Sequence, residues 1–318
     1  MDELDQYIRS LPKAELHLHL EGAVDIETLC RLAERHGLPP PRDSLYRYDH
    51  FRMFLKAFKV VCDHLVDAED YRIVTRRLAE RLHAAGAAYA EVYIAAGVLL
   101  WQKKPLEALF DGIDAGYREA RADTGVEMRW IFDATRQFGA EAALEMTRHA
   151  VRLRDRGVIG IGIGGDENNG PPEVFRDVYE YARGEGLRLT AHAGETAGPA
   201  SVWGALRALG AERIGHGLRA IDDPGLVAYL AEKRIPVDVC VSSNVCTGAI
   251  GAIEQHPLRR FFDAGLLVSL ATDDPAMFGT DLVREYRLAH DVFGFTRDEL
   301  AELAANSFRA AFCAPERA

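Results

Sequence analysis

The sequence of 318 residues has no long apolar run, no excess of positive charge and no closely spaced cysteine pair. No uncharged stretch approaches the roughly 20 apolar residues that a membrane helix needs. The 38 basic and 49 acidic residues give a net charge of −11, and such a field repels nucleic acids and anionic membranes. The first residues lack the basic and apolar segments of a signal peptide. We therefore expect a cytoplasmic protein without a nucleic-acid or membrane partner.

The five cysteines are odd in number and lie far apart, so they are expected to be reduced thiols rather than a disulfide framework. The hydrophobic share of 48% and the charged share of 27% are typical of globular proteins and exclude a disordered or collagen-like chain. No linker rich in Ser, Gly or Pro divides the sequence. We predict one domain that spans residues 1–318.

Eight short apolar runs are suited to buried strands and alternate with helical patterns. The runs cover residues 14–18, 88–94, 127–132, 158–163, 187–191, 213–215, 236–241 and 267–271. Helical patterns cover residues 104–122, 140–156, 171–184, 201–209, 224–233 and 281–293. This alternation favours an α/β fold in which parallel strands close into a (β/α)8 TIM barrel, with an open doubly wound sheet as the alternative. The first connection, about residues 25–86, contains amphipathic runs at 51–62 and 71–85, which predict a helical insertion over the active site.

Histidines and acids stand at the ends of several predicted strands. His17 and His19 are two residues apart, so both side chains project to the same face of the first strand. His192 ends the fifth run, His216 ends the sixth, and the pair Asp273–Asp274 ends the eighth. Two histidines separated by one residue are, by themselves, only a weak indication of a metal site. Any one of these polar residues is also explained as a hydrogen-bonded residue at the end of a strand. In a parallel barrel, however, all of them emerge at the same rim, where barrel enzymes place their chemistry.

The residue types at this rim suit metal-assisted hydrolysis. A zinc ion held by imidazoles and a carboxylate activates water at neutral pH, and the predicted ligands are His17, His19, His192 and Asp273. His216 and Asp274 are suited to orient that water and accept its proton. Glu195 can protonate the electrophile if burial keeps its carboxyl group protonated. The set therefore predicts hydrolytic attack on an unsaturated carbon.

The glycine-rich segment at residues 160–165 lacks the pattern of a phosphate-binding loop. We expect its glycines to let the backbone approach a ligand closely, just before Asp166 and Glu167. The seven histidines outside the strand ends are interpreted as surface or hydrogen-bonded helix residues.

Six segments together resemble the adenosine deaminase family, metal-dependent aminohydrolases of the amidohydrolase barrel type. The segments are PKAELHLHLEG at 12–22, GDE at 165–167, HAGE at 192–195, RIGHG at 213–217, SSN at 242–244 and TDDP at 272–275. The resemblance implies a (β/α)8 barrel and replacement of a purine 6-amino group by oxygen, with release of ammonia.

The resemblance also implies a role for each matching residue. One zinc ion per chain would be bound by His17, His19, His192 and Asp273. Glu195 would protonate purine N1, His216 would orient and deprotonate the water, and Asp274 would hold that water or contact N7. The Gly165 N–H would meet N3, His19 would contact the substrate, and Glu21 would face the ribose. Ser242 and Asn244 would have supporting or purely structural roles.

Two departures from the family pattern concern the substrate. Adenosine deaminases usually carry Asp where this chain has Glu21, and the family often carries Asp where this chain has Gly162. At position 215, by contrast, the chain resembles the nucleoside deaminases of the family. The adenine deaminases tend to carry Asp there, whereas this chain has Gly215.

We predict a zinc-dependent deaminase of adenosine, of 6-aminodeoxyfutalosine (the nucleoside of the futalosine route to menaquinone), or of both. The alternatives are an adenine deaminase, an N6-substituted AMP deaminase, a hydrolase of amides or phosphate esters from the wider group of metal-dependent barrels, and a nucleoside-binding protein without turnover.

Overall fold

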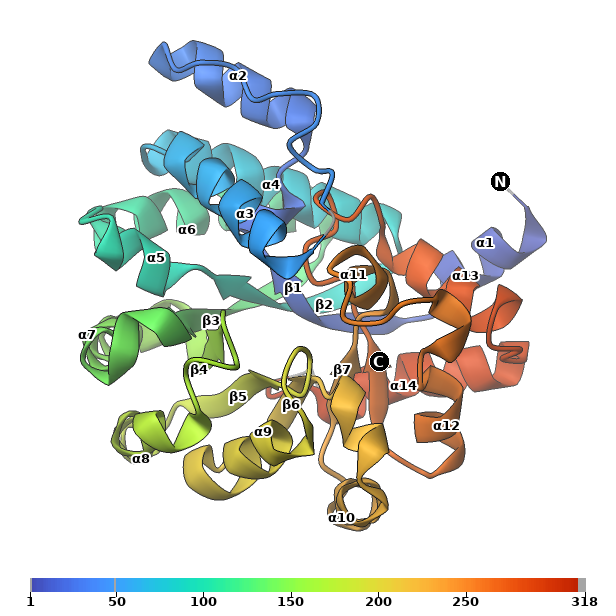
Figure 1. The fold of residues 1–318 in the computed structure, drawn as a ribbon. Coiled ribbons are helices and arrows are strands. Elements are labelled where there is room, and N and C mark those ends of the chain that lie inside the picture. Colours follow the sequence, from blue (N-terminus) through green and yellow to red (C-terminus); the bar gives the residue numbers. More distant parts are fainter. Residues whose placement is uncertain (1, 49, 314–318) are drawn as a thin grey trace.

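The computed structural model describes residues 2–48 and 50–313, and its eight parallel strands form a nearly closed (β/α)8 barrel (Figure 1). The strands are β1 (Lys13–His19), β2 (Ala87–Ile94), β3 (Glu127–Thr135), β4 (Val158–Gly164), β5 (Arg188–Ala193), β6 (Arg213–His216), β7 (Val237–Val239) and β8 (Val268–Leu270). Each strand pairs in parallel with the next one along the chain. Parallel neighbours require crossover connections, and here helices supply most of them.

Helices surround the barrel, as Figure 1 shows. They are α1 (Glu3–Ser10), α2 (Ile26–His36), α3 (Phe51–His64), α4 (Ala68–Ala84), α5 (Ala96–Trp101), α6 (Leu106–Thr124), α7 (Gly139–Arg152), α8 (Arg176–Gly184), α9 (Pro199–Gly204), α10 (Pro224–Lys233), α11 (Val241–Cys246), α12 (Leu258–Asp263), α13 (Leu282–Asp291) and α14 (Arg297–Ala310). Within the described residues, no helix combines the length and apolar character needed to cross a membrane.

The barrel closes between β1 and the segment that follows β8. The His19 N–H donates to the carbonyl oxygen of Asp273 over 2.7 Å, and the Asp273 N–H donates to the carbonyl oxygen of His17 over 2.9 Å. All seven residues of β1 are buried, because the strand lies between the barrel interior and the outer helices. The closure therefore joins the backbones of three residues that were predicted to share one site.

The long connection between β1 and β2 contains helices α2, α3 and α4. Helix α4 begins at a capping box formed by Asp67 and Asp70, and it packs against α6. Gly112 and Gly116 of α6 permit this packing, because a Cβ atom at either position would lie within 2.4 Å of the α4 backbone. The predicted helical insertion therefore lies against the barrel and carries α3 to the cavity described below.

The predicted order of elements is confirmed, including the weakly patterned sixth strand. Residues 224–233 form α10 as predicted, while the pattern at 201–209 divides into α9 and one turn of π-helix. The seventh strand is shorter than predicted. It ends at Val239, and Val241 begins helix α11.

Candidate active site

Most residues predicted from the sequence meet beyond the carboxyl ends of the strands. His17 and His19 belong to β1, His192 belongs to β5, and His216 is the last residue of β6. Asp273 follows β8, where its backbone joins β1. The parallel strand order thus brings groups from distant parts of the chain to one rim.

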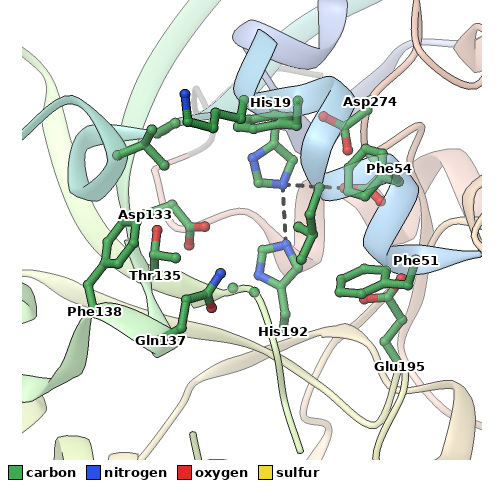
Figure 2. A pocket seen from close by; sticks show the side chains of 18 of the residues that line it. His19, Phe51, Phe54, Asp133, Thr135, Gln137, Phe138, His192, Glu195 and Asp274 are labelled. Carbon is green, nitrogen blue, oxygen red and sulfur yellow. Dashed lines mark hydrogen bonds and ion pairs between the residues drawn. The ribbon is translucent and has the colours of Figure 1, made fainter. Parts of the chain in front are cut away.

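Four of these side chains converge on one buried point. The Nε2 atom of His192 lies 3.0 Å from Nε2 of His17 and 3.2 Å from Nε2 of His19. Oδ1 of Asp273 lies 3.4 Å from Nε2 of His17 and 3.3 Å from Nε2 of His19. Figure 2 shows His19 and His192 facing each other at the centre of the site. Three ring nitrogens and a carboxylate oxygen therefore present lone pairs to the same small volume.

This donor set fits a bound cation. Zinc bonds of about 2.0–2.1 Å place neighbouring ligand atoms roughly 3–3.5 Å apart, which matches the observed separations. Burial disfavours a charged His19 ring, but the carboxylates of Asp274 and Asp273 outweigh it and raise the pKa of His19 to about 10. The site thus attracts positive charge. His216 lies close enough to belong to the same group, since its ligand atom and those of His17, His192 and Asp273 all lie within 4.8 Å of one another.

Two of the converging residues have left-handed backbone conformations. The φ angles are +63° at His216 and +65° at Asp273, in a region that non-glycine residues rarely adopt. For Asp273, the two hydrogen bonds to β1 hold this conformation. Such strain, of order 1–3 kcal/mol, persists only where surrounding contacts fix the backbone, and it is common at functional sites.

A chain of buried polar groups supports His216 and Asp273. The Ser243 hydroxyl donates to Oδ2 of Asp273 over 2.7 Å. Nδ2 of Asn244 lies 3.2 Å from Nδ1 of His216, and Oδ1 of Asn244 lies 3.1 Å from Nε2 of His256. His256 had been interpreted as a surface or helix histidine, yet it is buried and belongs to this chain. Its sequence context, a loop before α12, gives no signal of that position.

Glu195 lies in a loop that one buried carboxylate organises. Glu167 accepts hydrogen bonds from the backbone N–H groups of Gly194, Glu195, Thr196 and Ala197, at 2.5, 3.0, 2.8 and 3.0 Å respectively. It also accepts from the Ser201 hydroxyl over 2.5 Å. The loop cannot move without breaking several charge-assisted hydrogen bonds. Glu167 thereby fixes the direction of the Glu195 side chain.

The site shifts the pKa values of two neighbouring groups in opposite directions. Burial, together with the negative charges of Asp273 and Glu167, raises the pKa of Glu195 well above its usual range. Burial lowers the pKa of His216 to about 3, and the nearby His17 ring adds to the effect. The two side chains lie 3.7 Å apart. Burial therefore favours the protonated form of the Glu195 acid and the neutral form of the His216 imidazole.

Asp274 occupies a space that a glycine leaves open. A Cβ atom at Gly22 would lie 1.8 Å from Oδ1 of Asp274, so only glycine allows this approach. That oxygen has no hydrogen-bond partner among the described residues. Burial and the charge of Asp273 raise the pKa of Asp274 well above its usual range.

A cavity of about 260 Å³ joins these groups to an apolar mouth. Figure 2 shows Glu195 on one side and Asp133, Thr135 and Gln137 on the other. The full lining is His19, Phe51, Phe54, Leu55, Phe58, Lys59, Ala95, Val98, Trp101, Asp133, Thr135, Gln137, Phe138, Gly164, Gly165, His192, Glu195, His216, Asp273 and Asp274. Helix α3 supplies five of these residues, and α5 supplies Val98 and Trp101. Such a cavity suits a mainly apolar ligand with a few fixed polar contacts.

Two predicted residues do not line the cavity. His17 is fully buried behind it and reaches the cluster through Nε2. Glu21 is also fully buried, and its carboxylate accepts the Ala95 N–H at 3.2 and 3.3 Å. Asp133 also lines the cavity, although no sequence pattern predicted it there. Burial raises the pKa of Asp133 to about 7.

The sequence model of the adenosine deaminase family matches residues 12–318. The chain belongs to the adenosine deaminase family. Its resemblance to this family, inferred from the sequence, is therefore confirmed, as is a hydrolytic deaminase activity class.

Known members of the adenosine deaminase family differ in substrate. The chain is 39% identical to the aminodeoxyfutalosine deaminase of Streptomyces avermitilis over 98% of this chain and 89% of the relative. It is 34% identical to the adenosine deaminase of Klebsiella pneumoniae, over 95% and 94% of the two chains. The crystal structure of an adenine deaminase from Arthrobacter aurescens superposes with a TM-score of 0.92, at 32% identity over 97% and 96%.

The glycines at residues 162–165 of this deaminase lie close to side chains of a neighbouring segment. A Cβ atom at Gly165 would lie 2.4 Å from Oε1 of Gln137, and Gly165 has φ of +94°. Cβ atoms at Gly162 and Gly164 would meet the carboxylate of Asp133 at 2.7 and 2.9 Å. Gly162 and Gly164 thus leave room for the Asp133 side chain. Gly164 and Gly165 also line the cavity, and their close approach to a ligand stays a prediction.

We expect Glu167→Gln to lower both stability and turnover of the deaminase. An amide supplies one accepting oxygen and places an NH2 group against backbone donors, so the loop of Glu195 loses about 1.5–3 kcal/mol of charge-assisted hydrogen bonding. Thermal unfolding and kcat measure the two effects, with the exposed Glu180→Gln as the matched control. Equal melting temperatures and equal kcat for both variants would contradict this role.

Proposed function

We propose that this chain is a zinc-dependent hydrolytic deaminase of 6-aminopurine nucleosides, acting on adenosine, on 6-aminodeoxyfutalosine, or on both. One observation carries the proposal. Glu195, His216 and Asp274 surround the cluster of His17, His192 and their neighbours at the inner end of a single cavity. An acid, a base and a cation site within one enclosed volume are what hydrolysis of an amidine carbon needs.

The residues proposed to hold zinc are His17, His19, His192 and Asp273. A set of three imidazoles and one carboxylate suits zinc better than magnesium or calcium, which prefer oxygen ligands. When bound, zinc supplies Lewis acidity that activates water for attack at neutral pH.

The surrounding residues would direct the proton transfers. Glu195, held protonated, donates its proton to purine N1 and thereby makes C6 electrophilic. His216, held neutral, accepts a proton from the attacking water, and Asp274 orients that water. The C6–O bond forms, the C6–N6 bond breaks, and ammonia leaves. One water proton ends on the ammonia, and the other replaces the proton that Glu195 gave to N1.

The aromatic side chains at the opposite end of the cavity support a nucleoside that carries a 5′ extension. The mouth presents aromatic rings of α3 and the stacked pair Trp101 and Phe138, whose ring centroids lie 5.1 Å apart. The relative at 39% identity is named an aminodeoxyfutalosine deaminase, which favours a 5′-extended nucleoside over plain adenosine. Gly165 is proposed to donate its N–H to purine N3.

Side-by-side kinetics and metal analysis test the proposal. The purified chain is assayed by the ultraviolet change that accompanies loss of the 6-amino group, after zinc loading and after treatment with a chelator. We expect zinc-dependent turnover of 6-aminodeoxyfutalosine or adenosine, with adenine and N6-methyl-AMP as much poorer substrates. Faster turnover of adenine would instead support an adenine deaminase. No turnover of any 6-aminopurine by the zinc-loaded chain would refute the proposal.

We expect Glu21→Asp to shift substrate preference towards unsubstituted adenosine. The carboxylate of Glu21 accepts the Ala95 N–H at the start of α5, whose residues Val98 and Trp101 line the mouth. A shorter side chain loosens this hydrogen bond, so the mouth holds a 5′ extension less well, by about 5- to 10-fold in kcat/KM. The measurement is the ratio of kcat/KM between 5′-substituted adenosines and adenosine, with the exposed Glu27→Asp as control. A ratio that stays constant would mean that Glu21 does not determine selectivity.

A further inference from the structure

The Asp133 side chain is a buried acid, and one of its oxygens has no partner among the described residues. It projects from β3 into the cavity beside Thr135, where Figure 2 shows it across from Glu195. The residue is only 9% exposed, and its Oδ1 atom has no hydrogen-bond partner among the described residues. A buried carboxyl group without hydrogen bonds is costly, so such a group in a cavity is a candidate for ligand contact.

The neighbouring strand is shaped to accommodate this acid. Asp133 pairs in register with Gly162 of β4. A Cβ atom at Gly162 would lie 2.7 Å from Oδ1 of Asp133, and one at Gly164 would lie 2.9 Å from Oδ2. Any side chain at either glycine would displace the carboxyl group from its position at the cavity. The Asp133 carboxyl group therefore occupies the space that a side chain at position 162 would fill.

The chemistry of the proposed substrate limits what this acid can bind. In its ionised form the Asp133 side chain only accepts hydrogen bonds, whereas the ring nitrogens N1, N3 and N7 of a 6-aminopurine are themselves acceptors. The 6-amino group is a donor, but it must lie at the reacting end with Glu195 and His216. The remaining donors of a nucleoside are its sugar hydroxyls. Because Asp133 and Glu195 lie on opposite sides of the cavity, the sugar is the part that Asp133 can reach.

We infer that Asp133 binds a sugar hydroxyl of the nucleoside, an inference that rests on the proposed function. This contact makes the enzyme select ribonucleosides over deoxynucleosides and free bases. The acid therefore determines specificity without taking part in the bond-breaking steps. Removal of the Asp133 carboxyl group should lower kcat/KM for substrates that carry the contacted hydroxyl and leave it nearly unchanged for the analogue that lacks this hydroxyl.

The test measures how each Asp133 variant responds to the removal of individual sugar hydroxyls from the substrate. Wild type, Asp133→Asn and Asp133→Ala are assayed on adenosine, 2′-deoxyadenosine and 3′-deoxyadenosine. A charge-assisted hydrogen bond predicts that wild type prefers adenosine by about 10- to 100-fold in kcat/KM over the analogue lacking the contacted hydroxyl. The preference should fall in Asp133→Asn, which keeps one accepting oxygen, and nearly vanish in Asp133→Ala. The inhibition constants of inosine and the two deoxyinosines should follow the same order, which gives a readout that needs no chemical step.

Zinc content and thermal unfolding accompany each assay, and the exposed Asp155→Ala is the matched control. Equal losses on all three sugars, or losses that follow zinc content, would overturn the assignment of Asp133 while leaving the deaminase proposal intact. No turnover of any 6-aminopurine by the zinc-loaded wild type would instead overturn the proposed function. If Asp133→Ala removed a preference for adenosine over 3-deazaadenosine that Asp133→Asn retained, the side chain would be a donor to N3, and the sugar assignment would be wrong.

Discussion

The Glu195→Gln variant is expected to bind as much zinc as the wild type and to lose about 10²- to 10⁴-fold in kcat. The amide has the size of the acid and can form hydrogen bonds, but it has no proton to give to purine N1. Glu195 lies 3.7 Å from His216 and is not among the residues proposed to hold zinc. The loss should therefore be in kcat, with KM changed far less.

The pH dependence provides a second measurement on the same residue. Since the acid must be protonated to act, wild-type activity should fall as the pH rises through the raised pKa of Glu195. The Gln variant should lack this alkaline limb in its residual activity. The exposed Glu254→Gln is the control. A kcat equal to that of wild type in Glu195→Gln would show that another group protonates the substrate.

The barrel was predictable because its signals are local and repeated. Each buried strand is a short apolar run, and every run except the seventh is followed by a helical pattern, so the order of elements could be read along the chain. Helix α11 was not predictable in this way. Its residues, which include Val241, Ser242 and Asn244, have weak helical propensity. The Ser242 N–H donates to the carboxylate of Glu285 in α13, a contact that depends on the tertiary fold.

The positions of the rim residues were predictable for a different reason. Polar side chains at the ends of apolar runs are rare enough to stand out, and the parallel topology places all such ends together. His17, His19, His192 and Asp273 were therefore expected to converge before any distance was known, and they do.

Side-chain direction inside the site was not predictable. Glu21 was expected to face the ribose, but its carboxylate turns to the Ala95 N–H. Asp133 was overlooked, since a single acid in the third apolar run has no pattern around it. Its place at the cavity depends on the room left by Gly162 on another strand. Such contacts depend on packing between strands, which local sequence does not encode.

The Asp273→Ala variant is expected to lose zinc and, with it, nearly all turnover. Among the described residues, the substitution removes the only carboxylate oxygen within 3.4 Å of both His17 and His19, and it leaves the Ser243 hydroxyl without its acceptor. Three neutral imidazoles bind zinc more weakly than the set that includes a charged carboxylate. Metal analysis after dialysis should find less than about a tenth of the wild-type zinc, consistent with a 10- to 100-fold or greater loss of affinity. The exposed Asp222→Ala is the control.

Backbone strain must be separated from ligand loss in this experiment. Asp273 has a φ angle of +65°, where alanine is strained, so Asp273→Ala can lose zinc through a shift of the loop. Asparagine tolerates this conformation well, keeps the side-chain shape and lacks the charge. Asp273→Asn should therefore unfold near the temperature of the zinc-free wild type, yet gain little stability when zinc is added, whereas zinc should raise the melting temperature of wild type. Full zinc occupancy in Asp273→Asn would mean that the carboxylate is not a ligand, and His216 would then be the fourth group to test.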